Sequence, residues 1–104
     1  MKPRIPLDQE GIARFCRRWK ITEFSLFGSV LRDDFRPDSD VDVLVSFSPE
    51  AEWGLFEHAA MQDELAEMFN RKVDLITRRA VEHSRNPLRR QIIIESAQPY
   101  YVAG

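Results

Sequence analysis

Three aspartates are the residues of this 104-residue chain best suited to chemistry. Asp40 and Asp42 open a segment rich in Val and Leu that has the pattern of a strand, and residues two apart in a strand point to the same face, with Cα atoms about 6.5 Å apart. Two like charges side by side repel, so their presence in an apolar strand is explained if cations compensate them. Hard oxygen ligands with no His or Cys nearby suit Mg²⁺ or Mn²⁺ rather than Zn²⁺.

A third carboxylate, Asp74, lies within the short apolar segment 72–77, where a charge is costly unless it is paired or coordinated. If this segment and segment 40–47 are neighbouring strands, Asp74 reaches the face that carries Asp40 and Asp42. The three acids would then hold two metal ions about 4 Å apart, the arrangement that supports in-line displacement at phosphorus.

The residues that would bind the triphosphate precede the paired aspartates, with ten residues between Ser29 and Asp40. Gly28 allows close approach of the backbone, and the Ser29 hydroxyl and the free amides of a following helix start can donate to phosphate oxygens. Arg32 could neutralise the same phosphates. A calcium-binding EF-hand loop starting at Asp38 is excluded, because its sixth position is Val43 instead of glycine and its twelfth is Pro49 instead of a carboxylate.

The elements that must position these residues alternate between helices and strands. Hydrophobic periodicity predicts an amphipathic helix over 7–20 with Cys16 on its buried stripe, and a second over 54–69 that ends at Asn70. On that second helix we expect an apolar stripe of Leu55, His58, Met61, Leu65 and Met68. Trp53 and Phe56, at its start, are expected to pack in the core, with stacking on an adenine as the alternative. The predicted strands cover 23–27, 40–47, 72–77 and, at an edge, 99–102, and a last helix starts with the cap Asn86 and Pro87 and runs to 97. This pattern predicts an α+β fold, a small mixed sheet flanked by helices.

Composition limits the classes of protein. A hydrophobic content of 43% and a charged content of 31% indicate one globular domain over residues 1–104. The chain has no apolar run of the roughly 20 residues that a membrane span needs, and its single cysteine, Cys16, fits a reducing cytoplasm. We therefore expect a cytoplasmic protein without a membrane role, and an inert, packed thiol.

Charge and apolar surface are unevenly distributed along the chain. Residues 37–70 carry nine Asp or Glu and no Lys or Arg, between two basic flanks, as a cation site beside a polyanion requires. A basic cluster near the C-terminus could contact an acidic protein surface or RNA, or could be an ordinary solvated face: Arg78, Arg79, Arg85, Arg89 and Arg90. The last helix and final segment carry more apolar side chains than one stripe can bury, which leaves a partner surface or packing against the sheet as alternatives: Leu88, Ile92, Ile93, Ile94, Tyr100, Tyr101 and Val102.

Together, the segments 26–32, 39–45 and 71–77 resemble the signature of the minimal nucleotidyltransferases of the DNA polymerase β superfamily. The resemblance implies the nucleotidyltransferase fold of that superfamily. It also implies that Asp40 and Asp42 bind two Mg²⁺, that Asp74 assists one metal and accepts the proton of the attacking hydroxyl, and that Gly28 and Ser29 hold ATP.

By the same resemblance, stand-alone members act as antitoxins beside a HEPN-domain ribonuclease toxin, in a type VII-like toxin–antitoxin pair. The expected reaction is transfer of AMP from ATP to a tyrosine of the toxin, within a hetero-oligomer of the two proteins. Direct nucleic-acid binding is not expected. The alternative is an inactive antitoxin that keeps the fold and neutralises its partner by binding alone.

Overall fold

The computed structural model describes residues 8–28 and 40–103. Its elements are listed here in chain order: α1 (Gln9–Arg18), β1 (Ile21–Phe27), β2 (Val41–Phe47), α2 (Leu55–Phe69), β3 (Val73–Thr77), α3 (Arg78–Glu82), α4 (Pro87–Ser96) and β4 (Gln98–Val102). The four strands form one sheet in the order β3-β2-β1-β4. β2 and β3 are parallel, whereas β1 pairs antiparallel with both β2 and β4. The predicted α+β class with a mixed sheet is confirmed.

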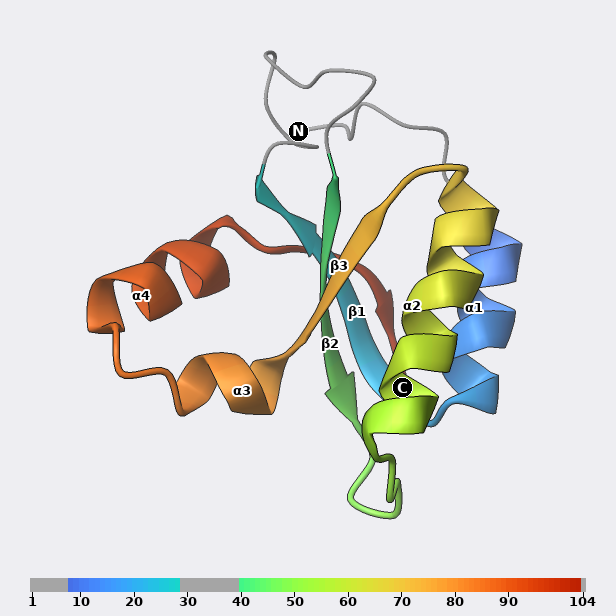
Figure 1. The fold of residues 1–104 in the computed structure, drawn as a ribbon, viewed down its shortest axis with the longest axis horizontal. Coiled ribbons are helices and arrows are strands. Elements are labelled where there is room, and N and C mark those ends of the chain that lie inside the picture. The colour runs from blue at the N-terminus through green and yellow to red at the C-terminus, as the bar shows by residue number, and fades with distance from the viewer. Residues whose placement is uncertain (1–7, 29–39, 104) are drawn as a thin grey trace.

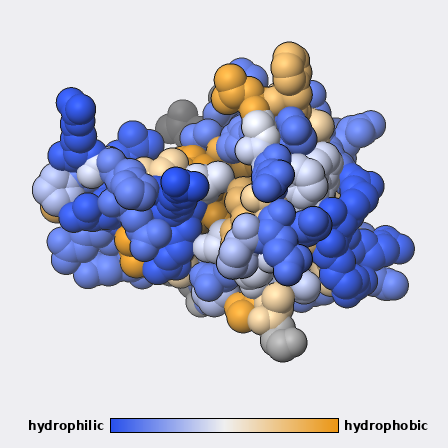
Figure 2. All heavy atoms as spheres, turned by 90° about the horizontal axis from the view of Figure 1, so that it is seen from below, coloured by the Kyte–Doolittle hydropathy of each residue, from blue (hydrophilic) through white to orange (hydrophobic). Residues whose placement is uncertain are grey.

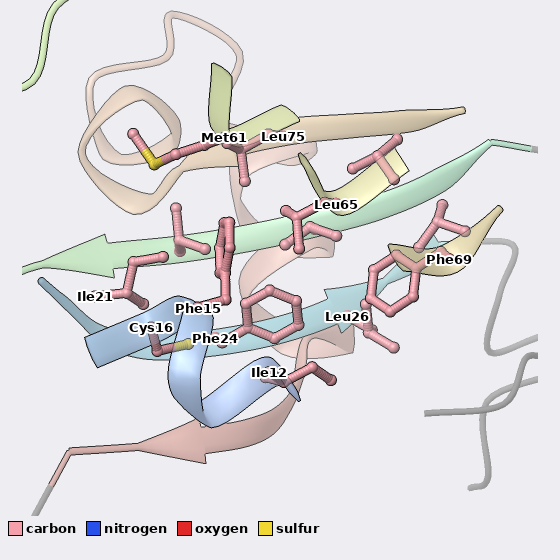
Figure 3. Packing of buried hydrophobic residues seen from close by; sticks show 14 residues of the cluster. Ile12, Phe15, Cys16, Ile21, Phe24, Leu26, Met61, Leu65, Phe69 and Leu75 are labelled. Atoms are coloured by element: carbon pink, nitrogen blue, oxygen red, sulfur yellow. The ribbon is translucent and has the colours of Figure 1, made fainter. Parts of the chain in front are cut away.

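Helices cover both faces of this sheet (Figure 1). On one face α1 and α2 pack against the strands and form the larger core, in which Phe15 and Cys16 of α1 meet Met61 and Leu65 of α2 over the strand residue Phe24 (Figure 3). On the other face a smaller cluster joins the sheet to α3 and α4: Phe27, Leu44, Val81 and Ile93. The alternation of side chains along the strands thus divides their buried hydrophobic residues between two cores.

The helix ends follow the local signals of the sequence. The Asp8 side chain caps α1 by accepting from the Gly11 amide at 3.0 Å, and the Asn86 side chain caps α4 by accepting from the Arg89 amide at 3.1 Å. Asn70 ends α2 in the left-handed conformation, with φ 55°. Predicted and observed boundaries of these helices agree closely, and Cys16 is fully buried as expected.

Two expectations about the core are wrong. The predicted stripe of α2 includes Leu55, and Phe56 was expected to pack in the core, yet Leu55 is 88% exposed and Phe56 is 90% exposed. The buried residues of α2 begin at Met61, so its first turn has no partner surface among the described residues. Figure 2 looks at the molecule from the end where β2 stops and α2 starts, and shows hydrophobic side chains at the surface among hydrophilic ones. Periodicity identifies the apolar face of a helix but not how far the opposing surface extends.

One further element differs from the prediction. The short helix α3 follows β3 without a loop, where the sequence predicted none. It starts because the Thr77 hydroxyl accepts from the Ala80 amide at 3.1 Å, a cap at the last residue of a strand. Within the part of the chain described, no helix is long and apolar enough to cross a bilayer.

Candidate active site

The two aspartates predicted to meet are adjacent in the sheet. Asp42 in β2 and Asp74 in β3 are Cα partners in the parallel register, so their backbones are one strand spacing apart, about 4.8 Å. Asp42 lies between buried Val41 and Val43, which belong to the larger core, so its side chain is directed to the opposite face. The same alternation, with buried Val73 and Leu75, directs Asp74 to that face. The carboxylate pair therefore lies on the side of the sheet that α3 and α4 cover.

The third predicted acid, Asp40, does not lie within a strand. Asp40 is exposed and lies immediately before β2, two residues from Asp42. Within residues 8–28 and 40–103, no three acidic, histidine or cysteine side chains are close enough together to hold a metal ion. The structure thus shows the pair of Asp42 and Asp74, and Asp40 as a further ligand stays a prediction.

Gly28 lies directly against Asp42, one member of this pair. It ends β1 with φ +77°, a left-handed conformation that side chains other than glycine's adopt at a cost. A Cβ placed on Gly28 would meet the Asp42 carboxylate, with its Cγ at 3.3 Å and one carboxylate oxygen closer still. The adjacent Phe27 is the antiparallel Cα partner of Asp42. The backbone conformation therefore favours glycine here, and a Cβ would displace the Asp42 carboxylate. Ser29 and Arg32 lie outside the described residues.

The donor set of this end of the sheet fits a divalent cation. Asp42 is half-buried and Asp74 is exposed, so both carboxylates can be reached from solvent. Carboxylate oxygens on neighbouring strands are the hard ligands that Mg²⁺ prefers. Neither histidine lies at this pair, because His58 belongs to α2 on the other face and His83 is exposed at the end of α3.

A cavity on the same face of the sheet is lined by residues whose positions could not be predicted from the sequence. This cavity of about 190 Å³ lies between β3, α3 and α4, and its walls include Ile76, Val81, Arg89, Arg90 and Ile93. Ile76 is two residues beyond Asp74 on the same face of β3. The basic cluster was visible in the sequence, but the position of Arg89 and Arg90 in this cavity depends on how α3 and α4 fold back over the sheet.

Comparison with known proteins agrees with this geometry. The profile described as a nucleotidyltransferase domain matches residues 9–100. A protein of Methanocaldococcus jannaschii named as a proposed protein adenylyltransferase is 30% identical over 66 residues, which is 64% of this chain and 66% of that protein. The matched part thus spans slightly less than two thirds of that relative.

Two solved structures share the fold. One, described as a proposed minimal nucleotidyltransferase, has a TM-score of 0.68 at 30% identity and covers 88% of this chain and 87% of its own. The other is a tri-AMPylated HEPN toxin of Shewanella oneidensis in complex with an MNT antitoxin, with a TM-score of 0.63 at 20% identity over 91% of this chain and 70% of the matched chain. Since the profile spans nearly all of the residues that build the sheet and carry the aspartate pair, this chain belongs to the nucleotidyltransferase domain family.

Proposed function

We propose that the protein is a Mg²⁺-dependent adenylyltransferase that transfers AMP from ATP to a tyrosine of a HEPN-type ribonuclease toxin and so acts as its antitoxin. The observation that carries the proposal is the register of Asp42 with Asp74, two carboxylates on one face, with Gly28 against Asp42. Such a pair is suited to a metal-bound triphosphate. The AMPylated toxin in the related complex and the adenylyltransferase name of the archaeal relative support AMP as the transferred group.

In this proposal each residue of the site has a defined task. Asp40, Asp42 and Asp74 hold two Mg²⁺, which would neutralise charge on the phosphates when bound. Gly28 and Ser29 hold the triphosphate through close backbone approach and donated hydrogen bonds, and Arg32 pairs with its charge. The tyrosine oxygen forms a bond to the α-phosphorus, the bond from that phosphorus to the leaving pyrophosphate breaks, and Asp74 accepts the hydroxyl proton.

The acceptor tyrosine is supplied by the partner, so the working unit is a hetero-oligomer of antitoxin and toxin. Exposed apolar side chains on α4 support a protein partner, since Leu88 is 66% exposed and Ile92 is 56% exposed. The free, buried thiol of Cys16 is compatible with a reducing compartment, and we place the reaction in the cytoplasm.

A second candidate is an antitoxin that neutralises the toxin by binding alone. The same exposed residues of α4 favour it, because an apolar surface serves docking with or without catalysis. The two candidates differ in the fate of ATP: only the first leaves AMP covalently attached to the partner.

The deciding experiment uses the full chain, a HEPN-type toxin as its partner, Mg²⁺ and ATP labelled at the α-phosphate. The proposal expects label retained on the toxin after denaturation, with the mass of AMP on a tyrosine peptide and loss of ribonuclease activity. Inhibition of the ribonuclease without label, over a range of nucleotides and metals, would favour the binding-only antitoxin. Neither label nor inhibition would exclude both candidates for this pair.

A further inference from the structure

The cavity between β3, α3 and α4 is lined by both apolar and cationic side chains. Its inner wall contains Val81 and Ile93, which are 4% and 7% exposed. Arg89, which is exposed, and Arg90, which is half-buried, also line the cavity. The volume of about 190 Å³ exceeds the ~150 Å³ of a cavity that holds a benzene ring. One aromatic or aliphatic side chain therefore fits inside.

The cavity and the aspartate pair share one face of the sheet. Ile76, in the cavity wall, lies two residues beyond Asp74 in β3, which is about 6.6 Å along the strand. Both side chains alternate with buried Leu75 and so point to the same side. A peptide that fills the cavity is thus held within a few residues of the two carboxylates.

The arginine side chains that line the cavity, Arg89 and Arg90, are available to a partner. Within the described residues the Arg89 side chain makes no hydrogen bond or ion pair, and Arg90 donates from its guanidinium to the Glu82 carbonyl oxygen at 3.3 Å. Residues 78–96, which form α3 and α4, carry five arginines against two glutamates. Figure 2 shows these helices as the mostly hydrophilic lobe on the left. A cavity lined by arginines favours carboxylates, which arginine binds through paired hydrogen bonds.

We infer that this cavity is the docking site for the acceptor segment of the partner protein, and that this segment carries an apolar residue and an acidic residue close to the target tyrosine. The apolar side chain fills the space between Ile76, Val81 and Ile93, and the carboxylate binds Arg89 and Arg90. This contact directs the tyrosine hydroxyl toward Asp42 and Asp74. The inference rests on the proposed function, since it concerns the acceptor of that same reaction, and it makes the arginines specificity determinants outside the catalytic group.

The test measures binding without chemistry. Three fluorescein-labelled ten-residue peptides carry a central phenylalanine, which cannot accept AMP, and one leucine; their flanking residues are glutamate, serine or lysine. Fluorescence anisotropy with the full chain at low ionic strength is expected to give at least tenfold tighter binding of the glutamate peptide than of the lysine peptide, with the serine peptide between them. Equal affinities for the three peptides would overturn the inference.

The charge variant Arg89→Glu separates docking from folding. It places an acid three residues after the helix cap Asn86, where a carboxylate is favourable, so α4 is expected to keep its stability. The variant should weaken glutamate-peptide binding about tenfold, the size of a lost charge-assisted hydrogen bond, and shift the preference toward lysine. The matched control is Arg14→Glu, the same change of charge at an exposed residue of α1 on the opposite face, which should leave binding unchanged. An equal loss in both variants would overturn the inference.

The apolar half of the site is tested separately by Ala80→Trp, which fills the cavity from α3 without a change of charge. It should weaken the leucine-containing glutamate peptide but not the same peptide with glycine in place of leucine. Loss of both would contradict the cavity as the apolar subsite. A labelled ten-nucleotide RNA that binds in an Arg89-dependent way when no peptide binds would assign the surface to nucleic acid and reject the inference.

These outcomes are distinguishable from a failure of the proposed function. Peptide selectivity without any AMP transfer would leave the docking site intact and reject the adenylyltransferase. AMP transfer to the toxin with no effect of Arg89→Glu on the KM for the toxin would support the adenylyltransferase and reject the docking site. If the adenylyltransferase and the docking site are both correct, Arg89→Glu raises the KM for the toxin and leaves the KM for ATP unchanged.

Discussion

Asp42 and Asp74 are Cα partners in the parallel register of β2 and β3. The amide of Val41 donates to the Lys72 carbonyl oxygen at 2.9 Å, immediately before the pair, and this bond fixes the register of the two strands. Since a shift by one residue would turn one carboxylate into the core, this pairing decides whether the two acids can act together. The proposed chemistry depends on it.

Replacing either acid by its amide should abolish transfer without unfolding the protein. Asp42→Asn or Asp74→Asn is expected to lower AMP transfer about a hundredfold or more, because a metal site stabilises the reaction by several kcal/mol. Mg²⁺ should raise the Tm of the native chain and have less effect on the variants, as binding to the folded state predicts. Asp63→Asn, an exposed residue of α2, is the control for a lost charge. Undiminished transfer in Asp42→Asn would refute the site.

Gly28→Ala should damage both stability and nucleotide binding. The backbone at φ +77° costs a residue with a side chain about 1–2 kcal/mol, and the new Cβ would displace the Asp42 carboxylate. We expect a loss of that size in urea unfolding and weaker ATP binding in calorimetry. Gly54→Ala is the comparison, since the nearest atom to its added Cβ is a Glu57 carboxylate oxygen at 3.8 Å. Equal effects of the two substitutions would show that crowding at Asp42 is unimportant.

Gln62 holds the strand that carries Asp74. Its side-chain oxygen accepts from the Leu75 amide at 3.0 Å, on β3 at the edge of the sheet. Gln62→Leu leaves that amide without its acceptor and should lower the free energy of unfolding by about 1–2 kcal/mol. Hydrogen exchange should become faster at Leu75, whereas Gln62→Glu, which keeps an acceptor oxygen, should preserve protection. An unchanged exchange rate in Gln62→Leu would contradict this role.

The exposed start of α2 should be neutral for stability. Phe56 is 90% exposed, so Phe56→Ser is expected to change the free energy of unfolding by no more than about 0.5 kcal/mol. Phe24 is fully buried in the larger core, and Phe24→Ala should cost about 3–5 kcal/mol. Chemical denaturation of both variants tests the contrast. A large loss in Phe56→Ser would mean that its side chain is buried in the protein in solution.

Cys16 should be unreactive in the folded protein. Burial raises the pKa of its thiol from 9.0 to about 12, against a smaller opposing effect of the Arg17 charge. Native protein should therefore resist iodoacetamide at pH 8 and react once unfolded in urea. Because the folded pKa is the higher one, the associated stability is complete below pH 9 and is lost as the pH rises toward 12. Cys16→Ala should remove this alkaline dependence, and rapid labelling of native protein would contradict the burial.

Local signals in the sequence were sufficient for most elements of the fold. The caps Asp8 and Asn86 and the left-handed end at Asn70 act within one helical turn, so the boundaries of the helices could be read from neighbouring residues. The helix α3 was missed because its cap, Thr77, is also the last residue of a strand with a β-rich pattern. The exposed positions of Leu55 and Phe56 depend on the length of the surface opposite α2, which no local pattern contains.

The sequence by itself determined which acids were candidates, since charges within apolar strands require a partner or a cation. Only the tertiary structure decided that Asp42 and Asp74 stand in register, because residues 32 positions apart meet through a strand pairing across an intervening helix. The same holds for the arginines of α4, whose position on that face of the sheet follows from the packing of Ile93 in one cluster with Phe27 and Leu44. Residue types set the chemistry, whereas long-range pairing and packing set which groups act on the same ligand.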